Sequence, residues 1–591
     1  MRNIADLISR QLLPRVRRPG QYVGLETNAR CNDVHAAEVS VALAFPDAYS
    51  VGISHLGSQV LYAMLNATPG AACDRSYCPP PDAEAVMRDR RIPLFGWESR
   101  CPLRQFDIVG FSLGYELCVT NVLTMLDLSC IPLRAADRGG GDPIVIAGDA
   151  LADTPEPMAD FIDLFLVGDG EEPLAALAEL VRQMKKRAAS RDEMILQAAR
   201  TIAAAYAPRF YRPQYNAEGS LAILQPLRDD VPNTIRRAHL ERLSDSPALT
   251  APLAPLAEAV HDRVTIEIMR GCPNGCRFCQ AGHTRLPLRA RSAEEIVQIA
   301  RAAIASTGHR EISLLSLSSS DYPHLDELID RLSGEFTPQH VSISLPSLRV
   351  DSQLRELPKL TSTVRKGGLT IAVEAASQRL RSAIRKDISD QNMLAGVKAA
   401  YQAGWKSVKV YFMAGFPGET PGDIDAIFEL CRRLSDLRRE VDGQRGAISA
   451  SLSWFVPKPH TPMQWCAMRE ADYFFAVRRR LKDLARRTPV SFKFHRIERS
   501  ILEAVLCRGD RRLGAAVEAA WRAGARMDAW DEHFDYPKWS AAFAQTGIDP
   551  AFYAHGPIKP GAVLPWSHIT DKRTEQFLLG EYRRMLETLG E

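Results

Sequence analysis

Three cysteines stand close together in the middle of the chain. Cys272, Cys276 and Cys279 fall within eight residues and have the spacing C-x3-C-x2-C. The apolar run 264–269 directly precedes them, so we place them on the loop that follows a β-strand. Three thiolates on one short loop can hold three corners of a cubic iron–sulfur cluster, and the fourth iron is then open to a small molecule.

Two other kinds of site could use cysteines, namely a structural zinc site and a redox-active disulfide. A structural zinc site normally takes four ligands, usually from two separated pairs. No Cys or His near the three cysteines has a conventional spacing for a fourth ligand, and His283 follows Cys279 too closely to complete such a site. We therefore expect the three cysteines to be ligands of an iron–sulfur cluster.

The segment 272–279 resembles the cluster loop of the radical S-adenosylmethionine superfamily. The resemblance is carried by the cysteine spacing, by Phe278 directly before the third cysteine and by the preceding strand. It implies one 4Fe–4S cluster whose open iron binds the amino and carboxylate groups of S-adenosylmethionine (SAM). It also implies that one electron, from a donor such as flavodoxin or ferredoxin, cleaves SAM to methionine and a 5′-deoxyadenosyl radical.

The elements that must position this loop begin at residue 264, where strands start to alternate with helices. Six such strand–helix units predict a partial (βα)6 barrel, the shape of the superfamily's core. Barrel enzymes place their chemistry at the carboxyl ends of the strands, and the cysteines follow the first of them. The predicted strands are 264–269, 311–317, 341–345, 369–374, 407–413 and 447–455.

The resemblance also matches two strand ends with polar side chains to contacts with SAM. Ser318 and Ser319 follow the second strand, where the superfamily often has a glycine-rich turn that receives the amino group of SAM. In this chain, serine hydroxyls and the backbone would take that role. Glu374 ends the fourth strand, where a polar side chain commonly binds the ribose. These matches concern cofactor binding, and the sequence identifies no catalytic residue.

A proline–glycine turn follows the fifth predicted strand. Gly415, Phe416 and Pro417 lie where the superfamily's backbone often meets the adenine, and Phe278 could contact the same ring. A tight connection between a strand and a helix would use the same residue types. Because the turn is in register with the cysteine loop, the resemblance favours a cofactor contact.

A proline-rich run, 454–465, begins at the end of the sixth predicted strand and would lie over the barrel mouth. Its side chains Lys458, His460 and Gln464 would be available to a substrate. A rigid loop with solvated polar tips is the alternative. Since a radical must be kept from solvent, this loop and the first domain are the candidates for closing the opening.

The first third of the chain also alternates strands and helices, which predicts a Rossmann-like α/β domain with a parallel sheet covered on both faces. Ligands of such sheets bind beyond the carboxyl ends of the strands. The predicted strands are 41–45, 106–111, 143–147 and 161–167, and the predicted helices are 56–65, 121–129 and about 168–186.

The order of these elements resembles the cobalamin-binding domain found upstream of many radical SAM enzymes. Two features depart from it, because a D-x-H-x-x-G motif is absent and an expected Gly-Gly pair reads Gly148-Asp149. Bound cobalamin and an empty Rossmann-like scaffold therefore both remain open. The matching pieces are 55–57, 108–112, 146–148, 154–156 and 168–171.

The last part of the chain is basic and predicted to be mostly helical. Residues 478–512 hold twelve Lys or Arg against four acids. Such a run could meet RNA phosphates, but a solvated helix face is the more common role. Segment 527–536 groups acids and aromatics around one histidine, for which a capped turn packed on the barrel is favoured over a metal site.

Composition sets the broad class. The 591 residues are 46% hydrophobic with a formal net charge of +3, which is ordinary for a soluble globular protein. The nine cysteines outside the triplet are scattered, and the chain shows no secretory signal and no membrane span, so we expect a cytoplasmic protein. The expected domains are 1–187 (Rossmann-like), 188–255 (linker), 256–475 (barrel) and 476–591 (C-terminal).

From end to end, the chain is similar to radical SAM proteins fused to an N-terminal cobalamin-type domain. This resemblance implies an enzyme whose radical abstracts hydrogen from an unactivated carbon, with methyl transfer as the outcome if cobalamin is bound. Rearrangement or oxidation without cobalamin is the alternative within the enzyme class. A non-catalytic iron–sulfur protein that docks RNA through its basic C-terminal region is the alternative from another class. The substrate is not identified by the sequence.

Overall fold

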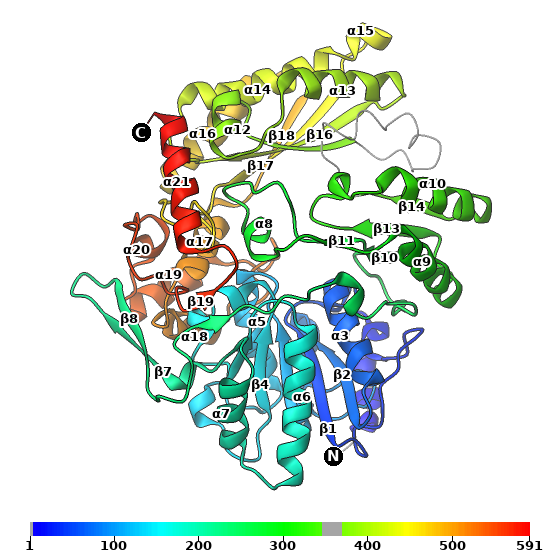
Figure 1. Cartoon of the computed structure of the whole chain (residues 1–591), viewed down its shortest axis with the longest axis vertical. Helices are drawn as coiled ribbons and strands as arrows, with labels where there is room; N and C mark the ends of the chain where they lie inside the picture. The colour runs from blue at the N-terminus through cyan, green and yellow to red at the C-terminus, as the bar shows by residue number, and fades with distance from the viewer. Residues whose placement is uncertain (1–3, 346–368, 591) are drawn as a thin grey trace.

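A computed structural model describes residues 4–345 and 369–590 of the chain. The N-terminal sheet lies at the bottom of Figure 1 and a second parallel sheet at the top, with the short helix α8 (Gln280–Thr284) between them. The C-terminal helix α21 (Glu575–Leu589) runs beside this central region. The cysteine loop directly precedes α8, so it lies between the two sheets.

The N-terminal sheet has the strand order β2-β1-β3-β4-β5-β6, in which β6 alone runs antiparallel to its neighbour. The order of its first members is that of a doubly wound fold, in which ligands bind where the strand order reverses, between β1 and β3. The Rossmann-like fold class is thus confirmed. The strands are β1 (Val39–Phe45), β2 (Ala71–Tyr77), β3 (Ile108–Ser112), β4 (Ile144–Gly148), β5 (Leu164–Leu166) and β6 (Ala205–Tyr206).

Helices cover both faces of this sheet in Figure 1. Strands β2 and β6 and helices α4 (Pro81–Arg90) and α7 (Arg191–Thr201) were not predicted. Strand β2 is wholly buried although its centre is polar, because Asp74 accepts backbone N–H groups and Arg75 pairs with Glu26 and Glu98. Helix α7 begins with a capping box in the expected linker. The helices are α3 (Leu56–Ala67), α4 (Pro81–Arg90), α5 (Val119–Leu128), α6 (Glu171–Lys186) and α7 (Arg191–Thr201).

The linker contains a hairpin of β7 (Tyr211–Tyr215) and β8 (Leu221–Pro226). Farther on, β9 (Ile235–Arg236) pairs in parallel with β19 (Ile569–Thr570). This pairing anchors the C-terminal segment to the linker, close to the N-terminal domain.

The central part consists of two parallel sheets. One has the order β10-β13-β14 and the other the order β15-β16-β17-β18. All the predicted barrel strands are present, and residues 346–368 lie outside the described residues. The strands are β10 (Val264–Glu267), β13 (Glu311–Leu315), β14 (Ser342–Ser344), β15 (Leu369–Glu374), β16 (Ser407–Ala414), β17 (Ala447–Trp454) and β18 (Val490–Phe494).

Strand β18 lies in the region that was expected to be mostly helical. Its apolar residues alternate, since Val490, Phe492 and Phe494 are separated by polar residues, but the surrounding charges hid this pattern. Helices fill the connections between the strands. They are α9 (Ala293–Thr307), α10 (Leu325–Phe336), α12 (Gln378–Ala383), α13 (Asp390–Gln402), α14 (Pro421–Asp436) and α16 (Ala471–Leu484).

The C-terminal part is mostly helical, as expected, but it packs differently from the prediction. The segment 527–536, which was expected on the barrel, contacts the N-terminal domain, since Thr120 donates to Asp528 at 2.8 Å and the Trp530 indole donates to Asp47 at 2.8 Å. The helices are α17 (Ile497–Arg508), α18 (Leu513–Arg522), α19 (Tyr536–Thr546), α20 (Pro550–Ala554) and α21.

The basic run 478–512 is divided among α16, β18 and α17. Arg508 is buried, and Arg511 reaches the carboxylate of Glu156 in the N-terminal domain at 3.0 Å. Arg480 is more exposed and pairs with Asp425. Several members of the run are therefore used in internal contacts rather than on one solvated helix face. Among the helices in the described parts of the chain, none is long and apolar enough to cross a membrane.

Candidate cofactor site

The cysteine loop is shaped by a tight backbone approach at its start. Strand β11 (Met269–Arg270) pairs with β12 (Arg289–Ala290), which brings the chain after α8 against the loop. At Gly271, whose φ is +90°, a Cβ atom would lie 2.8 Å from the carbonyl oxygens of Arg285 and Pro287. Only glycine fits such a position, so Gly271 is required for the loop to turn back toward α8.

The three thiols share one partly buried environment. The pKa of Cys276 is raised to about 11, mainly by burial, with Lys386 opposing the shift and the nearby Cys279 and Cys272 adding to it. Burial likewise raises the pKa of Cys279, whose sulfur caps α8 and accepts the Gly282 N–H at 3.4 Å. The thiol of Cys272 contributes to raising the pKa of both Cys276 and Cys279, so the three side chains lie near one another. This donor set fits the three-cysteine side of a cubic cluster.

In the described residues, no group of three or more His, Cys, Asp or Glu side chains is arranged to hold a single metal ion. This applies to the cysteine loop and equally to the segment 527–536, for which a metal site was the less favoured expectation.

Asn274 joins the cysteine loop to the turn after β13. Its side-chain amide lies 3.3 Å from the sulfur of Cys272 and donates to Asp321 at 2.8 Å, and Ser318 donates to the same carboxylate at 2.6 Å. Ser318 thus stands beside the loop. The hydroxyl of Ser319 is buried and hydrogen-bonded to Ser316 at 2.9 Å instead. Of the two predicted serines, only Ser318 is brought to the cysteines by these contacts.

Glu374 ends β15 in an unusual conformation. Its φ is +67°, and the register between β15 and β16 shifts at this residue. A left-handed glutamate is uncommon, and such strain is concentrated at functional sites. Burial raises the pKa of Glu374, and the Lys386 ammonium, 3.5 Å away, opposes that shift. Because Lys386 also lowers the pKa of Cys276, the Glu374–Lys386 pair lies near the thiols.

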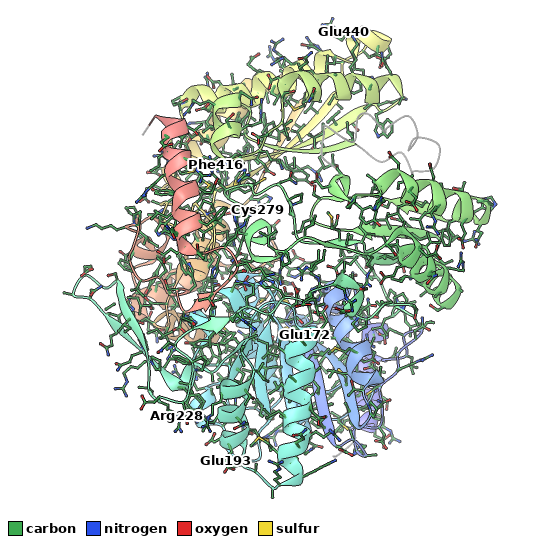
Figure 2. All side chains as sticks on the ribbon, viewed as in Figure 1. Glu172, Glu193, Arg228, Cys279, Phe416 and Glu440 are labelled. Atoms are coloured by element: carbon green, nitrogen blue, oxygen red, sulfur yellow. The ribbon has the colours of Figure 1, made fainter. Side chains whose placement is uncertain are left out.

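The aromatic residues expected at the adenine meet one another. The ring of Phe278 lies 6.1 Å from that of Phe416, which lies 5.2 Å from Phe455. Figure 2 labels Cys279 and Phe416 in the central region between the two sheets. Phe416 is fully buried in a cluster that includes Met585 of α21, so its ring belongs to the core and only its backbone remains for a cofactor.

A cavity of about 530 Å³ joins the cysteine loop to the N-terminal sheet. It is bounded by the carboxyl ends of β1, β3, β4 and β5 on one side and by residues around the loop on the other. This is the edge at which doubly wound sheets bind ligands. Residues that line it include His55, Ser112, Asp149, Gly170, Gly271 and Ala281.

Ion pairs hold the two walls of this cavity together. Asp149 lies 3.4 Å from His55 and 3.2 Å from Arg285, which follows α8. The surrounding positive charges hold the pKa of Asp149 well below its usual range despite burial. Asp169 pairs with Arg270 at 3.1 Å and with Arg289 at 2.6 Å. The N-terminal domain therefore forms ion pairs with residues on both sides of the cysteine loop, namely Arg270 before it and Arg285 and Arg289 after it.

Comparison with known proteins agrees with this geometry. Residues 57–208 match the family model described as radical SAM proteins, N-terminal, and residues 266–431 match the model of the radical SAM superfamily. The chain belongs to the radical SAM superfamily. The predicted radical SAM fold class and its two cofactors, a 4Fe–4S cluster and SAM, are thereby confirmed at the level of the superfamily.

Two relatives of known sequence are similar to this chain. It is 23% identical over 514 residues to an uncharacterised protein of Methanocaldococcus jannaschii, covering 86% of this chain and 97% of that protein. It is 28% identical over 252 residues to the tRNA-2-methylthio-N(6)-dimethylallyladenosine synthase of Anaeromyxobacter dehalogenans, covering 39% of this chain and 49% of that enzyme. The chain thus spans about half the length of the latter relative.

Two solved structures also show similarity. The methyltransferase TsrM of Kitasatospora setae, with cobalamin and a 4Fe–4S cluster bound, has a TM-score of 0.46 at 12% identity, covering 72% of this chain and 77% of TsrM. The cobalamin-dependent radical SAM enzyme OxsB has a TM-score of 0.46 at 11% identity, covering 93% of this chain and 79% of OxsB.

The proline-rich loop of this radical SAM chain differs from the expectation. Lys458 pairs with Glu116 at 2.6 Å and with Glu503 at 2.7 Å. The other two side chains expected to face a substrate are also occupied. His460 bonds to the backbone carbonyl of Asp153 at 2.8 Å, and Gln464 accepts the Trp566 indole N–H at 2.8 Å. The loop contacts both the N-terminal and the C-terminal domain. Its polar side chains are bonded to groups of those domains and are not available to a substrate.

Glu419, which the sequence did not single out, supports the turn after β16. Its carboxylate accepts the Gly415 N–H at 2.7 Å and a hydrogen bond from the Tyr473 hydroxyl. Gly415 has a φ of +103°, so the carboxylate holds a turn that needs glycine. Burial raises the pKa of Glu419 to about 7.

Glu419 should make stability depend on pH. Its pKa is about 7 in the folded protein against an ordinary value of 4.5, so the folded state binds the extra proton between these values. The free energy of unfolding therefore falls as the pH rises from about 4.5 to about 7, by an upper value of about 3 kcal/mol. Glu419→Gln should remove this loss, as measured by urea unfolding at pH 5 and pH 7.5.

Glu429→Gln is the matched control for this measurement, because Glu429 lies on α14 and its side chain is 54% exposed. It should unfold with the pH dependence of the unmodified protein. An equal pH dependence in Glu419→Gln and in the unmodified protein would mean that Glu419 is ionised in the folded state.

Proposed function

We propose that this protein is a radical SAM enzyme that cleaves SAM reductively and uses the resulting 5′-deoxyadenosyl radical to abstract hydrogen from an unactivated carbon. The observation that supports this most is the grouping of three cysteines on the loop after β10, whose flanking residues Gly271 and Ala281 line a 530 Å³ cavity. A carrier of iron–sulfur clusters would have no need of such a chamber.

In this proposal, Cys272, Cys276 and Cys279 hold the 4Fe–4S cluster. When bound, the cluster supplies the electron for SAM cleavage. The Lys386 ammonium and the Gly282 N–H both favour the thiolate form, because each lowers the pKa of a ligand cysteine.

The chain's other residues would orient SAM and exclude water from it. Glu374 is held at the strand end by its backbone and by Lys386, where its carboxylate can accept hydrogen bonds from ribose hydroxyls. Ser318 offers a hydroxyl next to the loop, and Phe278 with the backbone of the 415–417 turn would contact the adenine. The ion pairs between the domains hold the walls of the cavity around the cysteine loop, which would limit the entry of water.

The proposal is tested by reconstituting the protein with iron and sulfide under anaerobic conditions, reducing it with dithionite and measuring 5′-deoxyadenosine by mass spectrometry. We expect 5′-deoxyadenosine to accumulate with SAM present. Its absence from a protein that carries a full complement of iron and sulfide would contradict the proposal.

We further propose that the cavity takes cobalamin, so that the radical chemistry ends in methyl transfer to carbon. The support is positional, since the cavity lies at the carboxyl ends of β1, β3 and β4 and extends to the cysteine loop. A ligand there would stand between the N-terminal domain and the bound SAM.

Filling this cavity should prevent corrinoid binding. Ser112 ends β3, lines the cavity and lies 3.2 Å from the hydroxyl of Ser58. Ser112→Phe should place a ring in the cavity and lower bound cobalt by about tenfold or more, corresponding to at least about 1.4 kcal/mol of lost affinity. The measurement is the visible spectrum and cobalt content after incubation with hydroxocobalamin.

Thr201→Phe is the control, because Thr201 is exposed at the end of α7 and lies outside this cavity. It should retain cobalamin. Equal bound cobalt in Ser112→Phe and the unmodified protein would contradict cobalamin binding in this cavity, and no corrinoid in either protein would contradict cobalamin binding altogether. Both outcomes leave reductive SAM cleavage intact.

The alternative of a non-catalytic protein that docks RNA through residues 478–512 receives less support. Arg508 donates to the backbone carbonyl of Ala554, Arg511 pairs with Glu156, and Arg512 pairs with Asp510. The remaining basic side chains are spread over a strand and two helices.

A further inference from the structure

The C-terminal helix α21 lies beside α8 and the cysteine loop (Figure 1). It is anchored by the pairing of β19 with β9 and by a contact of 2.6 Å between Asp571 and Arg237. Directly after this anchor, Arg573 donates to Nδ1 of His283 in α8 at 2.8 Å. The anchored segment therefore brings the start of α21 onto the cysteine region.

Several arginines meet here around one carboxylate. Glu581 of α21 is 2% exposed, and it is approached by Arg277 at 3.1 Å, by Arg385 at 3.6 Å and by Arg584. One negative charge cannot balance these positive charges. The contacts leave a local excess of positive charge beside the cysteine loop.

Arg573 adds to this excess. Its partner His283 accepts at Nδ1 and contacts the Cys276 carbonyl through Nε2, which makes the imidazole neutral. Within the described residues, no carboxylate lies at ion-pair distance from Arg573. Burial and the nearby charge of Arg385 lower the pKa of Arg573, and the more distant carboxylates of Glu581 and Asp571 oppose this shift without cancelling it, so the two guanidinium groups repel each other. Such repulsion is relieved when an acidic surface approaches.

These charges lie directly against the loop that carries the cysteines. A Cβ atom at Gly275 would lie 3.4 Å from Arg385 Nη1 and 3.7 Å from Arg573 Nη1. Arg385 is 43% exposed and Arg584 is 62% exposed, so the guanidinium groups also reach solvent. By contrast, Gly271 and Ala281, at the two ends of the loop region, line the cavity.

We propose that Arg385, Arg573 and Arg584, here called the arginine face, form the docking surface for an acidic electron-donor protein of the flavin or iron–sulfur class. The inference rests on the proposed function, in which one electron must reach the cysteine loop. The donor loses one electron and the bound cluster gains it, with no bond or proton exchanged. Arg385 and Arg573 lie against Gly275, which stands between Cys272 and Cys276 in the loop.

An acidic protein fits this face better than RNA does. A nucleic-acid substrate must bring its reacting atom to the cavity, whereas an electron needs only a short path through the loop. Clustered cations that steer an acidic partner typically raise association rates 10- to 1000-fold at low ionic strength.

The test compares the unmodified protein with the double variant Arg385→Gln/Arg573→Gln and with Arg584→Gln. Each reconstituted protein is mixed with flavodoxin, flavodoxin reductase and NADPH, and reduced cluster is followed by electron paramagnetic resonance. We expect the double variant to be reduced about tenfold more slowly at low salt, with a weaker salt dependence, and Arg584→Gln to show a smaller loss. Dithionite should reduce all of them equally, which shows an intact cysteine loop.

Arg301→Gln is the control, because Arg301 lies on α9, is 59% exposed and pairs with Glu335. It should match the unmodified protein. Equal flavodoxin rates in all variants would overturn the inference, as would loss of tRNA binding in the double variant without any change in those rates. Failure of dithionite to produce a reduced cluster in the unmodified protein would overturn the proposed function as well.

Discussion

Cys276→Ala is expected to reduce 5′-deoxyadenosine formation to background. Cys276 is the middle cysteine of the loop, and the nearby Cys272 and Cys279 both influence its pKa. Replacing the partners that merely support metal ligands typically costs 10- to 100-fold, so loss of a ligand itself should exceed about 100-fold. The measurement is 5′-deoxyadenosine per protein after anaerobic reconstitution and dithionite reduction, together with bound iron.

The control for this prediction is another cysteine of similar exposure. Cys31 is also partly buried, lies in the N-terminal domain and donates a hydrogen bond from its sulfur to the backbone carbonyl of Asn32. Cys31→Ala should retain iron and activity. Substantial 5′-deoxyadenosine from Cys276→Ala, or its loss in Cys31→Ala, would show that the cysteine loop does not carry the chemistry.

The parts of the site that could be predicted are those with a local signature. The cysteine spacing identifies the loop without any tertiary information, and the apolar strands before Glu374 and Gly415 indicate which residues reach the carboxyl edge. Parallel strands bring their carboxyl ends to one side, so separate segments can be placed together from pattern alone. The doubly wound domain was predictable for the same reason, since its main strands are apolar throughout.

The residues that sequence reasoning missed act through long-range contacts. Lys386 follows a short helix and becomes relevant only because the fold places it against Glu374 and the thiols. Glu419 looks like an ordinary surface acid, and its high pKa arises from burial beneath Tyr473. Arg573 lies almost three hundred residues from His283 in the chain, so no local pattern could pair them.

The proline-rich loop shows why polar residues at a predicted barrel mouth were misassigned. A lysine, a histidine and a glutamine on such a loop suit a substrate, yet each is satisfied by a group from another part of the chain. Their role is to fix the barrel against the N-terminal and C-terminal domains. The shape of the cavity depends on those junctions, because its two walls come from different domains.

Lys458→Met is therefore expected to destabilise the protein strongly. Lys458 lies between Glu116 of the N-terminal domain and Glu503 of α17, and these carboxylates raise its pKa well above the ordinary value. Removing the ammonium leaves two half-buried carboxylates facing each other. Breaking a buried ion pair in this way typically costs about 3–5 kcal/mol. Urea unfolding at pH 7 should show the loss as a lower midpoint.

A matched exposed pair separates this effect from the loss of any lysine. Lys398→Met removes a 42% exposed lysine that pairs with Glu440, and it should cost less than about 1 kcal/mol. Adding Glu116→Gln and Glu503→Gln to Lys458→Met removes the unpaired charges, so stability should partly return. If Lys458→Met unfolds like Lys398→Met, the junction does not hold the domains together. Recovery in the triple variant would instead show that charge balance at this junction maintains the cavity between them.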